Sequence, residues 1–390
     1  MGEITDVRDG THDSPKYVQE GHPFITSKNV SNGFINYDDV QYVTDADYEE
    51  INKRSKVDVH DILMGMIGTI GNLALIRKEP DFAIKNVALI KYTGDVDYQY
   101  LYQALQAGCV TNQLSTGMDG GTQKFVSLKK IRELDIPFPD GWEQRKIGAY
   151  FSTIDHLITL HQQKITLLIK LKKAMLEKMF PKKGSVIPEI RFNGFANAWE
   201  QRKVLDLLIQ PITDGPHETP KLVEEGVPFI SVDAIVDNEI DFNRKRGNIS
   251  EEYDELCCKK YKPQFHDVYL VKSGSTVGKV AIVETTDRFN IWSPLAAMRC
   301  GEKTYPYFLY DLLQTKDLQA QVADKASNGT QPNLSMRELE KFPVSVPSNL
   351  EEQKKIGDYF RNLDHLITLY QRKIDKIKNM KKAMLDQMFI

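Results

Sequence analysis

Apolar residues recur every seven positions in two long segments of the chain, and this heptad pattern is the most regular feature of the sequence. In each segment two apolar series interleave, as the a and d positions of a pairing helix do. The residues expected to form the pairing face are Ile147, Phe151, Ile154, Ile158, Ile165 and Leu168 in the first segment and Ile356, Phe360, Leu363, Ile367, Ile374 and Ile377 in the second. The pattern predicts two long helices, each about 55 Å in length at 1.5 Å per residue. We expect them to pair with each other.

The two helical segments are copies of one another. Residues 144–180 align with residues 353–389 at a constant offset of 209, and 22 of the 37 aligned positions are identical, including the word DHLITL. Weaker matches upstream, such as Gly121-Thr122-Gln123 with Gly329-Thr330-Gln331, keep offsets of 205 to 208. A repeat that extends over the chain predicts two tandem units with one shared fold.

Two residue types interrupt the apolar pattern at matching positions. Lys172 and Lys381 occupy the same d position, where a polar residue can fix the register of paired helices or extend its amine to solvent near a frayed end. His156 and His365 lie inside the repeated word, but no His, Cys or carboxylate follows at i+4 to complete a metal-binding face. We therefore interpret both histidines as surface or inter-subunit residues.

The segments outside the helices predict mixed α and β structure. Short β-rich runs are followed by glycine-punctuated hairpins, then by helical stretches, and each unit ends in a proline-bounded strand, at residues 134–139 and 342–347. The expected fold class is α/β (α+β), with an internal pseudo-twofold repeat. The expected division is a first globular domain at 1–143, a helix at 144–180, a linker at 181–203, a second globular domain at 204–352 and a second helix at 353–390.

Composition favours a soluble protein of the cell interior. The four cysteines include no C-x-x-C pair, so we interpret them as reduced thiols and expect no metal site. The longest apolar run, from Ile62 to Ile76, contains three glycines and is too short to cross a membrane, and it is better explained as a pair of strands. No signal peptide is visible, and no membrane partner is expected.

The sequence offers no catalytic motif. Ser273 to Lys279 resembles a phosphate-binding loop, but serine replaces its first glycine and valine follows the lysine. No Pro-Pro dipeptide occurs, which removes the Asn/Asp-Pro-Pro-aromatic motif of amino-methyltransferases, and Pro80-Asp81 has no nuclease partner motif. We expect no catalytic residue and no metal in this chain.

Charge is distributed unevenly along the sequence. The segments 144–180 and 353–390 each have a net charge of +5 and the linker +3, whereas 1–143 and 204–352 each have −8. A protein that binds DNA through phosphates usually presents a basic face. The globular domains therefore either bind no DNA or concentrate their basic residues on one face while a partner helps to hold the duplex.

Two variable globular units, each followed by a nearly identical long helix, resemble the specificity (S) subunit of type I restriction-modification enzymes. The resemblance covers essentially the whole chain. It is carried by GTHDSPKY from Gly10, the GTQ loops at Gly121 and Gly329, the words WEQRK at Trp142 and Trp199, and the closing words KKAMLEKMF and KKAMLDQMF. No WEQRK word precedes the first unit, which leaves the leading edge of that unit open.

The resemblance implies a non-catalytic subunit with two target recognition domains, spaced by an antiparallel coiled coil. Its expected DNA target is bipartite and asymmetric. Its expected partners are double-stranded DNA, two methyltransferase (M) subunits and restriction motor-nuclease (R) subunits, in the cytoplasm of a prokaryote. The chain itself would need no cofactor, since the partner methyltransferase would use S-adenosylmethionine to methylate adenine N6.

Positions that match between the two units nominate loops for DNA contact, because amide side chains pair with adenine edges and Lys or His with guanine acceptors. The candidates in the first unit are Thr11, His12, Lys16, Tyr17, Ser27, Lys28, Asn29, Thr69, Thr122, Gln123 and Lys124. Those in the second are His217, Lys221, Ser231, Asp233, Lys272, Ser273, Ser275, Thr276, Thr330, Gln331 and Asn333. The alternative for each is that its side chain only satisfies the backbone of a turn.

Two other classes of function remain open from the sequence alone. A coiled-coil scaffold could bind two protein partners through its globular domains, and the acidic charge of those domains favours this alternative. An enzyme with an unrecognised active site is the third possibility. A neighbouring gene with an Asn-Pro-Pro-aromatic motif would separate the specificity subunit from both.

Overall fold

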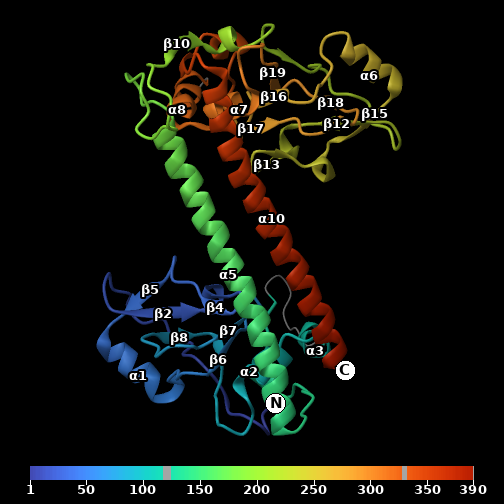
Figure 1. Ribbon diagram of the computed structural model, residues 1–390. Coiled ribbons are helices and arrows are strands. Elements are labelled where there is room, and N and C mark those ends of the chain that lie inside the picture. Colours follow the sequence, from blue (N-terminus) through green and yellow to red (C-terminus); the bar gives the residue numbers. More distant parts are fainter. Residues whose placement is uncertain (117–123, 327–331, 390) are drawn as a thin grey trace. The chain divides into compact units, whose positions relative to one another are not determined.

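The computed structural model describes residues 1–116, 124–326 and 332–389. They form two compact units (Figure 1), of which the first is not continuous in sequence. Unit 1 contains residues 1–163 together with 371–390, and unit 2 contains residues 164–370. Each unit therefore consists of one globular domain and a part of both long helices.

The described residues of unit 1 form three sheets with short helices around them. The largest has the strand order β1-β9-β6-β7, and the others have the orders β5-β2-β8 and β3-β4. Its strands are β1 (Val7–Asp9), β2 (His22–Thr26), β3 (Val30–Ser31), β4 (Phe34–Ile35), β5 (Gln41–Val43), β6 (Ile62–Gly65), β7 (Leu73–Leu75), β8 (Ala83–Lys85) and β9 (Val87–Ile90). Its short helices are α1 (Asp45–Ser55), α2 (Tyr98–Ala104), α3 (Gly108–Thr116) and α4 (Leu128–Arg132).

Unit 2 repeats this arrangement and adds one sheet. The repeated sheets have the orders β11-β19-β16-β17, β15-β12-β18 and β13-β14, and the additional sheet pairs β10 with β20. Its strands are β10 (Glu200–Lys203), β11 (Thr213–Asp214), β12 (Val227–Ile230), β13 (Ile235–Val236), β14 (Glu239–Ile240), β15 (Gly247–Ile249), β16 (Val268–Val271), β17 (Val280–Ile282), β18 (Asn290–Ile291), β19 (Leu295–Met298) and β20 (Pro343–Val346). Its short helices are α6 (Glu251–Cys258), α7 (Pro306–Gln314), α8 (Lys316–Lys325) and α9 (Met336–Glu340).

The matching strand orders confirm the predicted fold class and internal repeat. In both units the central strand of the largest sheet, β6 or β16, is buried along its length, as a strand covered on both faces must be. The apolar run from Ile62 forms the antiparallel hairpin of β6 and β7, as predicted, with its glycines at the turn. The middle sheet contains one parallel pair in each unit, β2 with β8 and β12 with β18.

The long helices are α5 (Gly141–Met179) and α10 (Leu350–Met388), and each begins three residues before its predicted start. Side-chain caps explain the earlier starts. The Asp140 carboxylate accepts hydrogen bonds from the backbone N–H groups of Trp142 and Glu143, both at 2.9 Å, and Asn349 Oδ1 accepts from Glu351 N–H at 2.8 Å. Such caps satisfy N–H groups that have no partner within the helix.

The helices run antiparallel where they meet in each unit. In unit 1, Phe151 lies near Phe389 and Asp155 pairs with Lys381, so the residue number rises along α5 as it falls along α10. In unit 2, Lys172 pairs with Asp364 and Phe180 lies near Phe360, with the same consequence. Of the residues predicted to pair, Ile165, Ile367 and Ile377 are half-buried and the others are buried.

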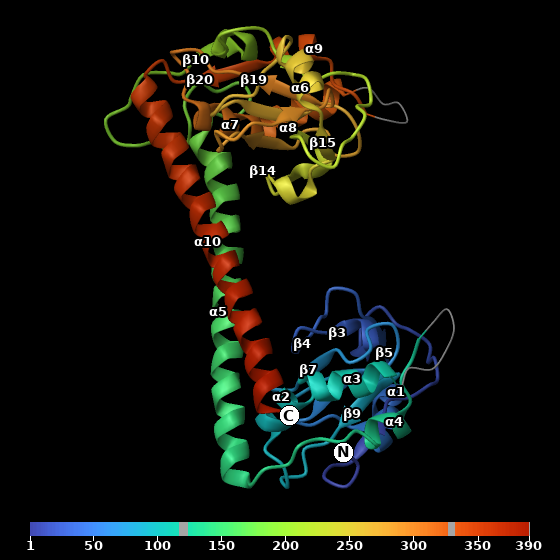
Figure 2. The ribbon, with the colours of Figure 1, turned by 90° about the vertical axis from the view of Figure 1, so that its right-hand side faces the viewer.

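The buried face of each helix also packs against its globular domain. In unit 2, Ile356, Phe360 and Leu363 share one apolar core with Phe308 of α7. In unit 1, Figure 2 shows the C-terminal end of α10 beside α2, where the Phe389 ring centroid lies 5.3 Å from that of Tyr100. A heptad pattern marks a face as apolar but does not say which neighbour covers it, so this second contact was not predicted.

Two expectations about segment boundaries were wrong. Residues 134–139 form no strand, whereas their counterparts form β20, because β20 has a hydrogen-bonding partner in β10 and the described part of unit 1 has no equivalent strand. The predicted linker, 181–203, ends in β10, and its Trp199 is buried with its indole N–H donating to Glu352 Oε1 at 3.3 Å. The last residues of the linker therefore belong to the second domain.

Candidate nucleic-acid interface

The motif Asp-Gly-x-His forms a polar corner at the end of β1 in unit 1. Asp9 is buried, and its carboxylate oxygen Oδ2 lies 2.8 Å from His12 Nε2. The same carboxylate forms an ion pair with the Arg54 guanidinium group at the end of α1. The other His12 ring nitrogen lies 2.7 Å from Asn86 Oδ1. A buried carboxylate is stable when it is paired with cations and hydrogen-bonded. In this corner the pairing holds an imidazole and a guanidinium at the surface.

Glycine is required at the second position of the motif. A Cβ atom built on Gly10 would lie 2.3 Å from the carbonyl oxygen of Ile84, and one on Gly215 would lie 1.8 Å from that of Ile291. No side chain fits at those distances. The close approach brings the motif against β8 in unit 1 and β18 in unit 2, which sets the position of the histidine two residues later.

Unit 2 builds the same corner with different cations. The Asp214 carboxylate is fully buried and receives Lys260 from the segment after α6, Lys272 Nζ at 3.3 Å and His217 Nε2 at 3.2 Å. The Lys260 amine also donates to the carbonyl oxygen of Gly215 at 3.1 Å. The His217 side chain is 70% exposed, so the corner again presents a positioned histidine to solvent.

The side chains of a second group of candidates form hydrogen bonds within the domain. The Ser27 hydroxyl donates to the carbonyl oxygen of Asn86 at 2.8 Å and accepts from Met66 N–H at 3.0 Å. Asn29 donates to the carbonyl oxygens of Asn36 and Asp39, and the Thr69 hydroxyl donates to that of Ser27 at 2.6 Å. Ser231, the counterpart of Ser27, is also buried. These contacts favour the turn-stabilising alternative for these side chains.

The remaining candidates divide by exposure. His12, Lys16, Tyr17, Lys28, Lys124, Lys221, Asp233, Ser275 and Asn333 are exposed, Thr11, Ser273 and Thr276 are half-buried, and Lys272 is buried. Lys28 pairs with Asp39 at 2.8 Å. The candidates Thr122, Gln123, Thr330 and Gln331 lie outside the described residues. DNA contact by any of these residues stays a prediction.

Sequence reasoning missed several residues of the two corners. Arg54 and Lys260 come from equivalent helix ends at an offset of 206, but they differ in residue type and no motif surrounds them. Lys85 on β8 donates to the Ser14 hydroxyl beside the first corner. In unit 2, the Arg246 guanidinium carbon lies 4.1 Å from the ring centroid of Trp292. Trp292 occupies the position in unit 2 that Lys85 occupies in unit 1. The only sequence signal for Arg54 and Lys260 was that two basic residues occur at matching positions of the two units.

The lysines in the heptad pattern form matched ion pairs between the helices. Lys172 Nζ lies 2.7 Å from Asp364 and 3.3 Å from Gln314 Oε1, and Lys381 Nζ lies 2.7 Å from Asp155 and 3.0 Å from Gln106 Oε1. Burial lowers the pKa of the Lys381 amine, and the neighbouring Asp155 charge opposes that effect. Both lysines are enclosed, so the contacts favour the register-fixing role over an amine extended to solvent. His156 and His365 are exposed.

The described residues offer neither a metal centre nor a membrane span. No group of three or more His, Cys, Asp or Glu side chains among them is placed to hold a metal ion. Within the same residues, no helix is both long enough and apolar enough to cross a membrane.

Comparison with known proteins identifies the family. Residues 2–171 and 199–379 match the family model described as type I restriction modification DNA specificity domain, once in each half of the chain. The chain belongs to this family. As a specificity subunit, it is a non-catalytic component of a type I restriction-modification system, as the sequence predicted.

Individual specificity subunits are similar over nearly their whole length. The MjaVIII specificity subunit of Methanocaldococcus jannaschii is 24% identical, with 95% of this chain and 89% of that protein aligned. The putative MjaX specificity subunit of the same organism is 23% identical over 97% of this chain and 89% of that protein. The crystal structure of the S subunit from M. genitalium has a TM-score of 0.64 at 15% identity, covering all of this chain and 94% of that one. A chain from a structure of type I R-M complex assembly has a TM-score of 0.54 at 17% identity, covering 99% and 95%.

Proposed function

We propose that this specificity subunit recognises a bipartite, asymmetric DNA target through its two globular domains and directs adenine-N6 methylation by its partner. The observation that carries the proposal is the polar corner built twice on one fold, each time with a histidine and cations anchored on a buried aspartate. Each corner would contact one half-site. Because the side chains of the two corners differ, the half-sites would differ as well.

The antiparallel helices support a fixed spacing between the half-sites. A coiled coil of α5 and α10 would hold the two domains in inverted orientation, and the ion pairs of Lys172 and Lys381 would prevent the helices from sliding. A shift by one heptad would leave four charges enclosed and unpaired, which is strongly unfavourable. The length of the DNA spacer would follow from this register.

The outer faces of the helices support docking of partner subunits. The repeated word DHLITL places Leu157 and Leu160 on the surface of α5, and Leu366 and Leu369 at the equivalent positions of α10. Each of these leucines is 37–44% exposed. Exposed apolar side chains that recur at equivalent positions fit a partner present in two copies, as expected for two methyltransferase subunits. Restriction motor-nuclease subunits would join the same assembly for cleavage.

The chemistry would belong to the partner. The adenine amino group is paired inside the duplex, so the methyltransferase must extrude the base before transfer from S-adenosylmethionine. This chain would need no cofactor of its own, and it would act in the cytoplasm of a prokaryote, where DNA and S-adenosylmethionine are both present. The acidic domains would rely on a partner to help hold the duplex, since each has a net charge of −8.

Single-molecule methylation sequencing tests this proposal. Cells that express the chain with its neighbouring methyltransferase should gain a bipartite adenine-methylation motif that is absent when only this chain is removed. His12→Gln should weaken discrimination in one half of the motif and His217→Gln in the other, so each variant is the control for the other. If no motif depends on the chain while the methyltransferase is active, the specificity role is refuted and a protein-binding scaffold becomes the better explanation.

A further inference from the structure

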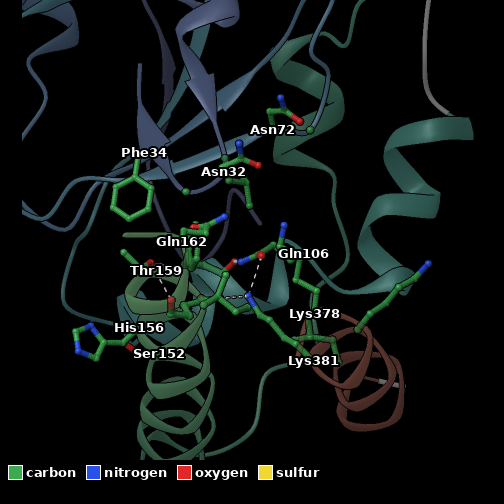
Figure 3. Close-up of a pocket in the computed structure, with 18 of the residues that line it drawn as sticks. Asn32, Phe34, Asn72, Gln106, Ser152, His156, Thr159, Gln162, Lys378 and Lys381 are labelled. Atoms are coloured by element: carbon green, nitrogen blue, oxygen red, sulfur yellow. Dashed lines mark hydrogen bonds and ion pairs between the residues drawn. The ribbon is translucent and has the colours of Figure 1, made fainter. Parts of the chain in front are cut away.

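A pocket of about 740 Å³ lies in unit 1 between the globular domain and the two long helices (Figure 3). Its walls come from the β3–β4 hairpin with Phe34, the hairpin segment at Gly71 and Asn72, Tyr102 of α2 with Gln106 just after that helix, and one face each of α5 and α10. Lys381 lines the pocket and is held by Asp155 and Gln106, and Figure 3 marks its contact with Gln106 by a dashed line. The side chains that line it are mainly polar.

The lining of the pocket is basic, although the first globular domain as a whole is acidic. Among the described residues, Arg77, Lys378, Lys381 and Lys382 line it against a single carboxylate, Asp155. Arg77 is fixed at the wall, because its Nη1 donates to the Gly33 carbonyl oxygen at 2.7 Å and its guanidinium lies 4.7 Å from the Phe34 ring centroid. A concave surface lined by one sign of charge concentrates its electrostatic potential. Such a pocket attracts anions.

Unit 2 has an equivalent pocket of about 640 Å³ with the same balance of charge. Its described lining contains Lys172, Lys173, Lys279 and Lys316 against one carboxylate, Glu177. Lys172 and Lys173 are the counterparts of Lys381 and Lys382, and Gly278 and Gln314 are the counterparts of Gly71 and Gln106.

The other two cations in each pocket come from positions that do not match. Lys279 and Lys316 correspond to Asn72 and Gly108 of unit 1, whereas Arg77 and Lys378 correspond to Glu284 and Ile169 of unit 2. Four cations against one carboxylate are therefore reached in the two units by different residues. A purely structural role would not require the charge to be restored from new positions, whereas binding an anion would.

Each pocket adjoins a hairpin that the sequence nominated for DNA contact. In unit 1 the hairpin that carries Thr69 continues directly into the lining residues Gly71 and Asn72. In unit 2 the hairpin that carries Ser275 and Thr276 continues into Val277 and Lys279. A DNA strand that contacts the hairpin would therefore pass the mouth of the pocket.

We propose that each pocket binds phosphate groups of the DNA backbone next to the half-site that its domain reads. The inference rests on the proposed function and adds a second, sequence-independent contact to it. In unit 1 the exposed amines of Lys378 and Lys382 engage the phosphates, and the enclosed Lys381 contributes its charge. Contacts of this kind set affinity and salt dependence and carry no sequence information.

The test measures binding of the full chain, in complex with its methyltransferase, to two duplexes over a range of potassium chloride concentrations. One duplex carries the methylated motif and the other a scrambled sequence. Lys378→Ala/Lys382→Ala should lower the slope of log affinity against log salt by about 1.8, since each phosphate contact contributes about 0.9. The loss should be equal on both duplexes, and the methylation motif should not change. Arg372→Ala/Lys376→Ala removes two other exposed cations of α10 and should keep the wild-type slope.

The scrambled duplex separates this inference from the proposed function. An unchanged slope on that duplex overturns the phosphate contact, whether or not the wild-type complex prefers its target. Loss of methyltransferase binding by the Lys378/Lys382 variant, with an unchanged slope, also overturns it and assigns the pocket to a protein partner. If the slope falls on both duplexes but the wild-type complex shows no target preference, the phosphate contact stands and the proposed function fails.

Discussion

At the scale of single residues, the two units place different side chains beside the ion pair that joins their helices. In unit 1 the Gln103 amide donates to Asp155 at 2.7 Å and supports the carboxylate that pairs with Lys381. The counterpart of Gln103 in unit 2 is Asp311, a fully buried carboxyl for which the structure shows no hydrogen-bond partner at either oxygen. Burial raises the pKa of Asp311 well above its ordinary value, Lys172 opposes this, and the Asp364 charge adds to it. Burial therefore favours the neutral form of this carboxyl over its charged form.

Asp311 should make the stability of unit 2 depend on pH. Because its pKa is raised in the folded state, its contribution is fully present below the unfolded pKa and is lost as the pH rises toward the folded value. Asp311→Asn keeps a neutral side chain at every pH and should raise the free energy of unfolding by roughly 1–2 kcal/mol at pH 8, with little effect at pH 4. Thermal melting from pH 4 to pH 9 measures this. Asp287→Asn, at an exposed turn, is the control, and equal curves for Asp311→Asn and wild type would contradict the argument.

A glycine at one matching position of the two long helices allows each helix to pack closely against its globular domain. Gly148 on α5 faces the first turn of α2, where an added Cβ would lie 2.7 Å from the Tyr100 backbone nitrogen. Its counterpart Gly357 faces Phe308 in the same way, at 2.9 Å. Glycine weakens an exposed helix, so its presence at both positions is explained by the close approach of the domain. The repeat made these glycines visible in the sequence, but the contact that requires them was not.

At the scale of elements, the word WEQRK shows where sequence reasoning reached its limit. At residues 142–146 it forms the first turns of α5, with Trp142 60% exposed, and at 199–203 it leads into β10, with Trp199 buried. The five residues are identical, so local preference cannot explain the difference. What differs is the partner: Glu200–Lys203 pairs with β20, whereas Asp140 caps the helix that contains the first copy. Strands depend on distant partners, which a single sequence does not list.

The periodic elements, in contrast, could be predicted well. The heptad pattern located α5 and α10 to within three residues at their starts, because a helix is specified by its own apolar face. The repeat then located the equivalent strands and hairpins. For the candidate site, the motif Asp-Gly-x-His was visible in both units, but the buried role of Asp9 and Asp214 and the cations from α1 and from the segment after α6 depend on the tertiary fold.

The ion pair of Lys381 with Asp155 joins the two helices of unit 1. It should contribute more to the register in which the helices pair than to the free energy of unfolding. Lys381→Met leaves the largely enclosed Asp155 without its cation and should cost roughly 1–3 kcal/mol in the free energy of unfolding. Combining it with Asp155→Leu should recover much of that loss, since an apolar pair of similar size often replaces a buried ion pair without cost. Urea unfolding of the two single variants and the double variant gives the coupling energy. Additive effects would show that the pair contributes nothing.

At the scale of the whole molecule, each globular domain is completed by a helix segment from the other copy of the repeat. The first globular domain is completed by residues 371–389, whose Leu385 and Phe389 are buried in unit 1. The second domain includes Leu168 and Met179 of α5, and Phe180 just after that helix, in its core. Neither copy of the sequence repeat therefore coincides with one of the two compact units.

Removal of the C-terminal part of α10 should therefore damage the N-terminal domain. A chain that ends at residue 370 loses the apolar contacts of Leu385 and Phe389, each worth roughly 2–5 kcal/mol on removal from a core. Hydrogen exchange should show faster exchange in β6 and β9 and near-wild-type protection in β16 and β19. The single variant Phe389→Ala should show the same pattern more weakly. Faster exchange confined to unit 2 would contradict the division of the chain.

The interlacing of the units has a consequence for synthesis on the ribosome. Domains that are contiguous in sequence can fold as soon as they emerge, and in most multidomain chains the N-terminal one does so first. Here the first domain emerges early but waits for residues 371–389, which appear only after the whole of unit 2 has been translated. Until then the apolar face of its helix is exposed to other nascent chains. The second unit can be completed first, and we expect the order of folding to be the reverse of the order of translation.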